Sequence, residues 1–332
     1  RFSQILASSL AAPALLGTPL AQSQQRVLLR AGDQKGGLQA LLDAAGELKN
    51  LPYDIKWSEF PAAAPLAEAL NADAVDFGII GDAPLLFTLA AGSRVKAFAA
   101  SRSDAYGTAI LVQPDSPLKS AADLKGKRIA TNRGSIGHYV TLKALDAVGL
   151  GADDIQLRFI PPAEAKLALT QGSVDAWATW DPYTALAETS KHARVLVSGR
   201  GLWTGLSYLA ATESALRDKR ATLQDFKDRV ARAQVWSYQN PDSFSATLAR
   251  IIGIPEEAAK LQFVRRATRW VSIDEQVVAD QQRTADFYIK AGLLKCAADI
   301  DGVTPALETM ARAVARAHNE TGLPIMVHSH PG

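Results

Sequence analysis

Short apolar runs alternate with helical patterns along the chain up to about residue 211. Each run predicts a strand, and the apolar residues that follow it recur at the three-to-four spacing of a helix. This βαβ rhythm is typical of an α/β fold. The predicted strands are 26–31, 53–59, 75–80, 94–100, 108–112, 128–131, 155–160, 174–179, 194–197 and 206–211.

Helical patterns connect these strands and make up nearly all of the chain after residue 213. The predicted helices are 38–48, 62–70, 83–91, a short one within 121–126, 136–148, 163–171, 182–188, 223–238, 243–252, 255–264, 274–291 and 303–317. Pro114, Ser116 and Pro117 interrupt the rhythm, which then restarts, so the pattern predicts two α/β lobes. The extended segments 108–113 and 206–212 are the expected hinge crossings, with a ligand cleft between the lobes.

The first residues do not fit this rhythm. Arg1 precedes an apolar, small-residue run over 5–16, followed by Gly17, Pro19 and Ala21. This is the form of a secretory signal whose charged start is truncated, so residues 1–24 are expected to be removed from an exported, soluble protein. No cysteine follows the segment, so no lipid anchor is expected.

Composition narrows the classes of function. The net charge of the 332-residue chain is only +2, and no block of lysines and arginines stands out, which argues against a nucleic-acid partner. The single cysteine, Cys296, excludes an internal disulfide and a cysteine-rich zinc site. We expect it to be a bystander thiol, and we expect neither a metal nor a cofactor.

One kind of turn recurs three times, each time where a strand ends and a helix begins. The turns are Gly81-Asp82-Ala83-Pro84, Asn132-Arg133-Gly134-Ser135 and Trp180-Asp181-Pro182. Each helix start presents unpaired backbone N–H groups and a positive dipole end. Several such ends around one crevice would hold a small anion. The first turn falls on the first lobe and the other two on the second, so an anion would favour the closed form.

The chain resembles periplasmic aliphatic-sulfonate-binding proteins of ABC importers, within the wider nitrate, sulfonate and taurine group. The matching motifs lie between residues 26 and 308. They are Gln34-Lys35-Gly36-Gly37, Val75-Asp76-Phe77-Gly78 with the Gly81 turn, Ala109-Ile110-Leu111-Val112, Asp115-Ser116-Pro117, Asp123-Leu124-Lys125-Gly126-Lys127-Arg128, Gly134-Ser135, Gly172-Ser173-Val174-Asp175-Ala176-Trp177 and Trp180-Asp181-Pro182-Tyr183. The order of these motifs and the pairing of Asp-Ala-Trp with Trp-Asp-Pro-Tyr make the likeness specific.

The resemblance implies a type II, two-lobed periplasmic binding protein that closes on its ligand like a flytrap and carries out no covalent chemistry. We expect lobe I at 25–110 and 210–325, lobe II at 111–209 and a disordered tail at 326–332. The implied function is capture of aliphatic sulfonates for sulfur uptake and delivery to an inner-membrane permease. We expect the protein to be monomeric.

The expected ligand-binding residues come from the turns, the first glycine-rich turn and the crossings. The sulfonate would be held by backbone N–H groups and by the hydroxyl of Ser135. The full expected set is Gln34, Gly81, Asp82, Ala83, Ala109, Gly134, Ser135, Ile136, Trp180, Asp181 and Trp203. Plain helix capping is the alternative role for Ser135 and Asp82, and Lys35 and Arg133 could add positive potential. Core packing is the alternative for Trp177 and Trp180, and His138 is expected to be structural.

Other functions remain open at this point. A binder of nitrate, taurine or a pyrimidine precursor would share the scaffold, and taurine would need an acidic partner such as Asp82 or Asp181. A desulfinase-like enzyme would want a cysteine in the early lobe, whereas Cys296 lies late. Ser135 with His138 could form a hydrolase pair, but no Gly-x-Ser-x-Gly elbow supports it. The export segment argues against the ligand domain of a transcriptional regulator.

Overall fold

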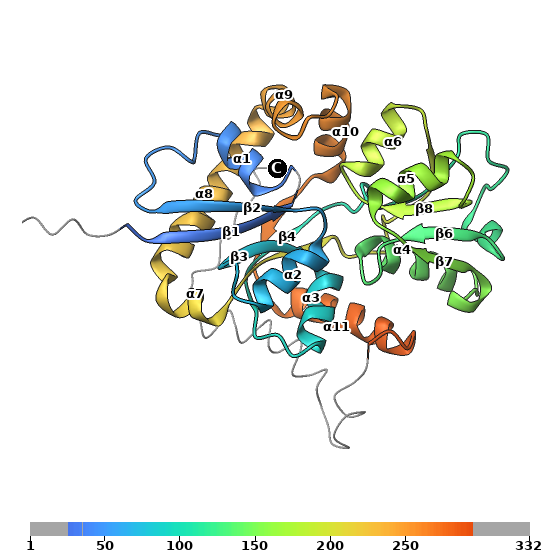
Figure 1. Ribbon diagram of the computed structural model, residues 1–332, viewed down its shortest axis with the longest axis horizontal. Coiled ribbons are helices and arrows are strands. Elements are labelled where there is room, and N and C mark those ends of the chain that lie inside the picture. Colours follow the sequence, from blue (N-terminus) through green and yellow to red (C-terminus); the bar gives the residue numbers. More distant parts are fainter. Residues whose placement is uncertain (1–25, 35, 295–332) are drawn as a thin grey trace, which may run out of the picture.

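Two separate β-sheets organise the structure, a computed structural model that describes residues 26–34 and 36–294 (Figure 1). The first sheet has the order β11-β4-β10-β3-β1-β2, and the second has the order β7-β6-β8-β5-β9. The strands of the first sheet are β1 (Leu28–Gln34), β2 (Asp54–Phe60), β3 (Phe77–Gly81), β4 (Lys96–Arg102), β10 (Leu206–Ala211) and β11 (Arg269–Val271). Those of the second are β5 (Ala109–Val112), β6 (Arg128–Thr131), β7 (Gln156–Phe159), β8 (Ala176–Thr179) and β9 (Arg194–Ser198).

Helices cover both sheets. The helices of the first lobe are α1 (Leu38–Ala44), α2 (Ala63–Asn71), α3 (Asp82–Ala90), α7 (Glu213–Asp218), α8 (Arg220–Gln239), α9 (Pro241–Ile252) and α10 (Glu256–Arg266). Those of the second are α4 (Ile136–Asp146), α5 (Pro162–Thr170) and α6 (Tyr183–Thr189), with the 3-10 turns η1 (Ala121–Leu124) and η2 (Ala152–Asp154). The last described helix is α11 (Glu275–Lys290). The two-lobed α/β fold predicted from the sequence is confirmed.

Each sheet contains a strand that arrives from the other lobe. β5 lies antiparallel between β8 and β9, and β10 lies antiparallel between β3 and β4. The chain therefore changes lobe within 103–108 and 199–205, ahead of the predicted crossings at 108–113 and 206–212. The prediction misplaced the crossings because their most apolar segments are β5 and β10, which are buried inside the sheets.

An aspartate–arginine ion pair joins two neighbouring strands in each lobe, at the end of the sheet away from the cleft. Asp76 accepts hydrogen bonds from the backbone N–H and the guanidinium of Arg30, and it also binds Lys219. Asp175 holds the backbone N–H and the guanidinium of Arg128 in the same way. In both lobes an aspartate just before a central strand thus fixes the neighbouring parallel strand, β1 in the first lobe and β6 in the second.

Helix α11 joins the two lobes. Val277, near its start, packs in a cluster with Ile80 and Leu206 of the first lobe. Ala285 and Tyr288, near its end, pack in a cluster that belongs mainly to the second lobe. The sequence predicted this helix but not its position across both lobes.

Some predictions fall on residues that the structure does not describe. The targeting segment 1–24, the helix 303–317, the tail 326–332 and Cys296 all lie outside the described residues. Within the described residues, three elements were not predicted as such: the 3-10 turn η2, the short helix α7 and the three-residue edge strand β11.

Candidate functional site

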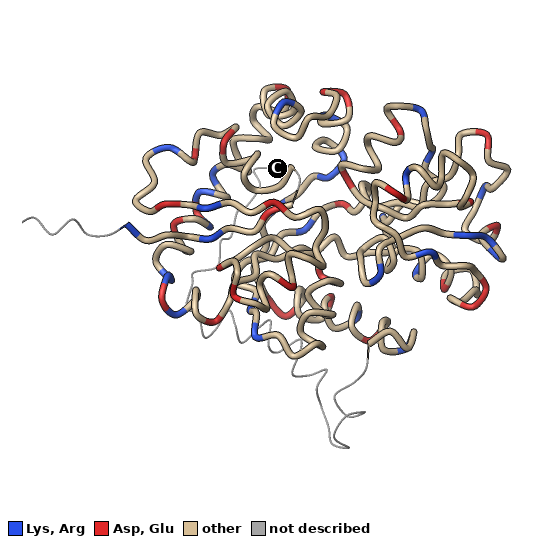
Figure 2. Tube along the Cα trace, viewed as in Figure 1, with Lys and Arg blue, Asp and Glu red and all other residues tan. Residues whose placement is uncertain are grey.

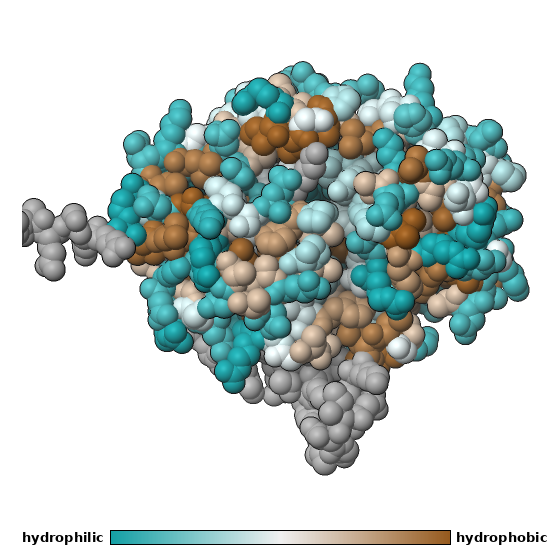
Figure 3. All heavy atoms as spheres, viewed as in Figure 1, coloured by the Kyte–Doolittle hydropathy of each residue, from teal (hydrophilic) through white to brown (hydrophobic). Residues whose placement is uncertain are grey.

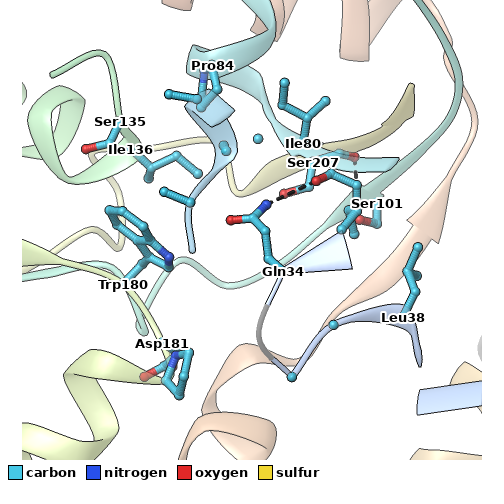
Figure 4. Close-up of a pocket in the computed structure, with 18 of the residues that line it drawn as sticks. Gln34, Leu38, Ile80, Pro84, Ser101, Ser135, Ile136, Trp180, Asp181 and Ser207 are labelled. Carbon is cyan, nitrogen blue, oxygen red and sulfur yellow. Dashed lines mark hydrogen bonds between the residues drawn. The ribbon is translucent and has the colours of Figure 1, made fainter. Parts of the chain in front are cut away.

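A cavity of about 630 Å³ lies between the two lobes. The ends of β1, β3, β4 and β10 line it from the first lobe, and the turns before α4 and α6 line it from the second. Figure 4 shows Ile136 and Trp180 of the second lobe facing Gln34 of the first. The cavity therefore lies where a ligand would contact both lobes.

The structure brings most of the expected site residues together and leaves others out. Those that line the cavity are Gln34, Gly81, Gly134, Ser135, Ile136, Trp180 and Asp181. Asp82, Ala83, Ala109 and Trp203 are not among the lining residues. Gln34 is held in place because its amide N–H donates to the carbonyl of Ile79 at 3.1 Å.

The helices that begin at the cavity differ in what occupies their first turns. In α1, α3 and α6 an aspartate accepts hydrogen bonds from the first backbone N–H groups: Asp33, Asp82 and Asp181, respectively. In α4 the cap is neutral, since the hydroxyl of Ser135 accepts from the backbone N–H of His138 at 3.2 Å. A carboxylate at a helix start takes the place of an anionic ligand. Among these four starts, that of α4 is therefore the one best suited to an anion. The start of α2, where Ala62 makes no side-chain cap, also lines the cavity, but Glu68 of the same helix adds a negative charge there.

Positive charge supports this assignment. Arg133 directly precedes the α4 turn and lines the cavity, with its guanidinium 3.9 Å from the ring centre of Phe159. Arg266, at the end of α10, lines the cavity from the first lobe. Neither arginine forms an ion pair with another residue in the described part of the chain. Elsewhere, charges of both signs are interspersed over the two lobes (Figure 2).

Asp82 has a structural position instead of the expected ligand contact. It is fully buried, and its carboxylate accepts hydrogen bonds from the indole of Trp203 at 2.7 Å and from the hydroxyls of Thr204 and Thr284. Burial raises the pKa of Asp82 from 3.8 to about 6. The residue ties α3 to the second crossing and to α11. Ala83 and Ala109 are likewise fully buried.

Asp181 lies at the cavity but is already paired. Its carboxylate binds the guanidinium of Arg265 on α10 through two hydrogen bonds, and Arg265 also pairs with Glu188 on α6. The side chain of Asp181 is 4% exposed. This ion-paired group joins α10 of the first lobe to the α6 region of the second, and it leaves Asp181 without a free carboxylate for a cationic ligand.

His138 is buried and stabilises the turn before α4. Its Nδ1 accepts from the backbone N–H of Gly134 at 3.2 Å, and its ring packs edge-on against Phe159. Burial, with the nearby charge of Arg133, lowers the pKa of His138 to about 4, so the ring is neutral at physiological pH. No hydrogen bond joins the imidazole to the hydroxyl of Ser135 among the described residues.

Sequence reasoning missed several residues that line the cavity, and three of them, Ser207, Ser101 and Trp270, lie in one row with Gly81. Register partners place Gly81, Ser207, Ser101 and Trp270 in one row across β3, β10, β4 and β11, and all four line the cavity. A small polar residue ending an apolar strand, as Ser101 does, was the available signal. Trp270 lies in a strand too short for any periodic pattern, and nothing in the sequence pairs Arg265 with Asp181.

Two classes of feature do not occur among the described residues. Within 26–34 and 36–294, no group of three His, Cys, Asp or Glu side chains could hold a metal ion. No helix in this part of the chain is long and apolar enough to cross a membrane. Figure 3 shows a mostly hydrophilic outer face with apolar patches, one of them over α9 and α10.

Comparison with known proteins identifies the family. Residues 57–244 match the model described as NMT1/THI5 like. A putative aliphatic sulfonates-binding protein of Escherichia coli is 35% identical over 277 residues, covering 82% of this chain and 86% of that protein. The crystal structure of the E. coli periplasmic aliphatic sulphonate binding protein SsuA matches with a TM-score of 0.73 and covers 80% of this chain and 88% of that one.

A second solved structure agrees. The alkanesulfonate-binding protein SsuA from Xanthomonas axonopodis, bound to MOPS, is 32% identical, with a TM-score of 0.76, and covers 82% of this chain and 96% of that one. The desulfurization enzyme DSZB is 19% identical and shares the fold alone.

The C-terminal part also matches a different family. Residues 262–332 match the phosphotriesterase family model. A phosphotriesterase homology protein of Mycobacterium tuberculosis is 58% identical over 48 residues, which is 14% of this chain and 15% of that protein. So small a share of that protein does not carry over its activity, and the described residues 26–34 and 36–294 form the two lobes. The chain belongs to the NMT1/THI5-like family and, within it, to the aliphatic-sulfonate-binding proteins.

Proposed function

We propose that the chain is a solute-binding protein that captures aliphatic sulfonates between its lobes and delivers them to an ABC permease for sulfur uptake. The observation that carries this proposal is the α4 start, where Ser135, a neutral cap, lies beside Arg133 in a cavity lined by both lobes. The names of the relatives and the fold support the same function.

The proposed head-group site suits a sulfonate chemically. A sulfonate spreads one negative charge over three oxygens and stays ionised at any physiological pH. The hydroxyl of Ser135, the first-turn N–H groups of α4 from Ile136 and the guanidinium of Arg133 supply donors and charge. Gly81 lets the α4 start lie close to β3, because a Cβ at this position would lie 2.6 Å from the side chain of Ile136. Trp180 and Gln34 complete the walls of the site.

The geometry disfavours two alternatives. Taurine carries an ammonium group, but the two aspartates expected to hold it are not available, because Asp181 is neutralised by Arg265 and Asp82 is buried away from the cavity; Glu68 of α2 is a carboxylate that does line the cavity. A hydrolase pair would need the imidazole of His138 to activate Ser135, whereas that imidazole binds Gly134. We therefore propose binding without covalent chemistry. Nitrate would leave most of a 630 Å³ cavity unfilled.

The remaining parts of the proposal concern the whole protein. We infer export of a mature protein beginning after residue 24, a periplasmic location and a monomeric state. We also propose that lobe I comprises the chain before the crossing at 103–108 and after the crossing at 199–205, with lobe II between them, in place of the expected limits 25–110 with 210–325 and 111–209. The permease partner follows from the importer class of the family.

Isothermal titration of the purified protein tests the proposal. Ethanesulfonate is expected to bind with a Kd in the micromolar range or below, with sulfate, nitrate and taurine weaker. Binding of nitrate without any sulfonate would refute the sulfonate site. Release of sulfite from a sulfonate would refute the binding function as a whole.

A further inference from the structure

A buried carboxylate lies beside the proposed anion site. Asp82 begins α3 and is fully buried. Gly81, directly before it, lies against Ile136 at the start of α4, because a Cβ on this glycine would be 2.6 Å from the isoleucine side chain. Phe87 of α3 lies against Gly134 in the turn before α4, where a Cβ would be 3.1 Å from the phenyl ring. The helix that begins with Asp82 therefore packs directly on the start of α4.

The charge of Asp82 reaches the same helix start. Burial, and after it the charge of Asp82, raises the pKa of Tyr139 on α4 to about 12. The same two causes raise the pKa of Tyr288, whose hydroxyl donates to the carbonyl of Ser135 at 3.3 Å. An ionised tyrosine is an anion, so Asp82 disfavours negative charge in this region. A negatively charged ligand near Ser135 would be disfavoured in the same way.

No cation compensates the charge of Asp82 within the described part of the chain. The groups that bind its carboxylate are uncharged donors: the indole of Trp203 at 2.7 Å, the hydroxyls of Thr204 at 3.3 Å and Thr284 at 3.5 Å, and the backbone N–H of Ala83 at 2.7 Å. A buried carboxylate without a cationic partner ionises at a higher pH than one in water. Burial places the pKa of Asp82 at about 6 in spite of these donors, so its charge changes just below neutral pH.

Other charged and titratable groups lie on the elements packed around Asp82. They are Arg133, His138 and Tyr139 of the α4 region, Tyr208 of β10, Arg102 of β4, Glu68 of α2, and Asp280, Arg283 and Tyr288 of α11. Asp280 forms ion pairs with both arginines of its group, on β4 and on α11. Burial raises the pKa of the three tyrosines and lowers that of the histidine to about 4, so these four are neutral between pH 5 and 8.

A sulfonate at the α4 start would add a second negative charge on the neighbouring helix. Like charges disfavour each other, so the bound ligand raises the pKa of Asp82 further. By the same linkage, the sulfonate binds more tightly when Asp82 is protonated. The affinity is therefore highest below about pH 6. It falls as the pH rises from the pKa of Asp82 in the free protein to its pKa in the complex, and it is constant above both.

We propose that Asp82 couples the capture of a sulfonate to the uptake of a proton, so that the protein holds its ligand more tightly in mildly acidic surroundings. The proposal rests on the sulfonate site proposed above. It adds a regulation of that site by pH, exerted by a residue that does not line the cavity.

Isothermal titration with ethanesulfonate between pH 5 and 8 tests the coupling. Ethanesulfonate is ionised throughout this range, so a change in affinity belongs to the protein. We expect binding to be roughly three- to tenfold tighter at pH 5 than at pH 8, as like charges on neighbouring helices allow at an effective dielectric constant of about 20. Near pH 6.5, binding should take up roughly 0.3–0.5 proton. The binding enthalpies in bis-tris and in phosphate measure this uptake, and neither buffer is itself a sulfonate.

A matched pair of variants assigns the coupling to Asp82. Asp82→Asn should bind ethanesulfonate with similar affinity at pH 5 and pH 8 and without proton uptake. Asp33→Asn is the control, because Asp33 is also buried, with its pKa raised to about 6, but it caps α1. Its charge does not contribute to the pKa of Tyr139 or Tyr288. Asp33→Asn should therefore keep most of the pH dependence of the wild type.

A further variant tests the coupling even if Asp82→Asn fails to fold. Trp203→Phe removes a donor that stabilises the ionised carboxylate of Asp82. The loss of this hydrogen bond should move the fall in affinity to higher pH by about one unit. A fall at the same pH in Trp203→Phe and in wild type would contradict the role of Asp82.

The outcomes separate the two proposals. If no sulfonate binds at any pH, the proposed function itself fails. If ethanesulfonate binds equally well at pH 5 and pH 8 and without proton uptake, only the coupling is refuted. The coupling is also refuted if Asp82→Asn keeps the pH dependence of the wild type, or if Asp33→Asn abolishes it.

Discussion

At the scale of single residues, the caps of the helix starts decide where an anion can bind. Asp33 and Asp82 are 4% and 0% exposed, and both hold first-turn N–H groups of their own helices. Their carboxylates already use the favourable field of the helix ends. Ser135 is uncharged and leaves that field at the start of α4 available to an anionic ligand.

Ser135→Ala should weaken binding of every sulfonate by roughly 10- to 100-fold, because a hydrogen bond to a charged group contributes about 1.5–3 kcal/mol. It should also lower the free energy of unfolding by about 1 kcal/mol, since a helix cap is lost. Thr212→Ala is the matched control: Thr212 caps α7 by accepting from the N–H of Ala215, away from the cavity. Titration and thermal unfolding separate the two effects, and equal affinity losses in both variants would contradict a ligand role for Ser135.

The buried carboxylate of Asp82 predicts a pH dependence of stability. Because its pKa rises from 3.8 to about 6 on folding, the folded protein binds this proton more tightly than the unfolded chain does. The contribution of Asp82 to stability is therefore complete below about pH 4 and is lost as the pH rises through 6. Relative to wild type, Asp82→Asn should gain up to about 3 kcal/mol in unfolding free energy between pH 4 and 7.5.

Denaturant unfolding of both proteins across this pH range measures the difference. Any loss of hydrogen bonds in Asp82→Asn adds an offset that does not change with pH. A difference between the two proteins that stays constant from pH 4 to 7.5 would contradict the raised pKa.

At the scale of elements, α10 and the α6 region form the described ionic contact across the cleft. Arg265 is 13% exposed and binds both Asp181 and Glu188. Removing one partner of a buried ion pair leaves the other charge uncompensated. This costs free energy while the lobes are in contact, and the cost falls when the lobes separate and water hydrates the charge. The pair therefore favours the arrangement in which the lobes meet.

Arg265→Met should separate the lobes in the ligand-free protein and weaken sulfonate binding by at least about tenfold, since the liberated Asp181 must be buried again on closure. Small-angle X-ray scattering should show a larger radius of gyration. Arg232→Met is the control, because Arg232 pairs with Glu47 within the first lobe and is half exposed. Unchanged scattering and affinity in Arg265→Met would show that this pair does not hold the lobes together.

At the scale of the whole molecule, α11 packs against both lobes and connects their cores. Tyr288 is fully buried and packs on Phe87 of α3 and on Tyr139 of α4, with ring centres 5.0 and 5.3 Å away. Its hydroxyl donates to the carbonyl of Ser135. The core at this point is therefore shared between the lobes.

Tyr288→Ala should lower the free energy of unfolding by about 3–5 kcal/mol, as expected for a large aromatic truncated in a core. Because the shared core is lost, calorimetry should also show the single unfolding transition broadening or dividing into two. Tyr106→Ala removes a tyrosine that is 37% exposed and should have little effect. A similar loss in both variants, or an unaltered single transition in Tyr288→Ala, would contradict the bridging role.

The sequence predicted local elements well and long-range contacts poorly, for physical reasons. Apolar runs such as Phe77–Gly81 can be recognised locally, because a strand buried on both faces reads as a continuous run of apolar residues. The direction in which a side chain points depends on distant partners. Asp82 was expected at the ligand because its turn is typical of an anion site, whereas its partner Trp203 lies 121 positions later. Trp270 reaches the cavity only through the pairing of β11 with β4.

The position of α11 has a consequence for how a ligand leaves. Because α11 packs on both lobes, it opposes their translation relative to each other, whereas a rotation about the helix axis keeps its contacts. We therefore expect the lobes to rotate about the axis of α11, so that the cavity opens unevenly along the row from Gly81 to Trp270. A bound ligand would leave first from the end of the row at which the lobes separate more, and its dissociation rate would depend on how far that end opens.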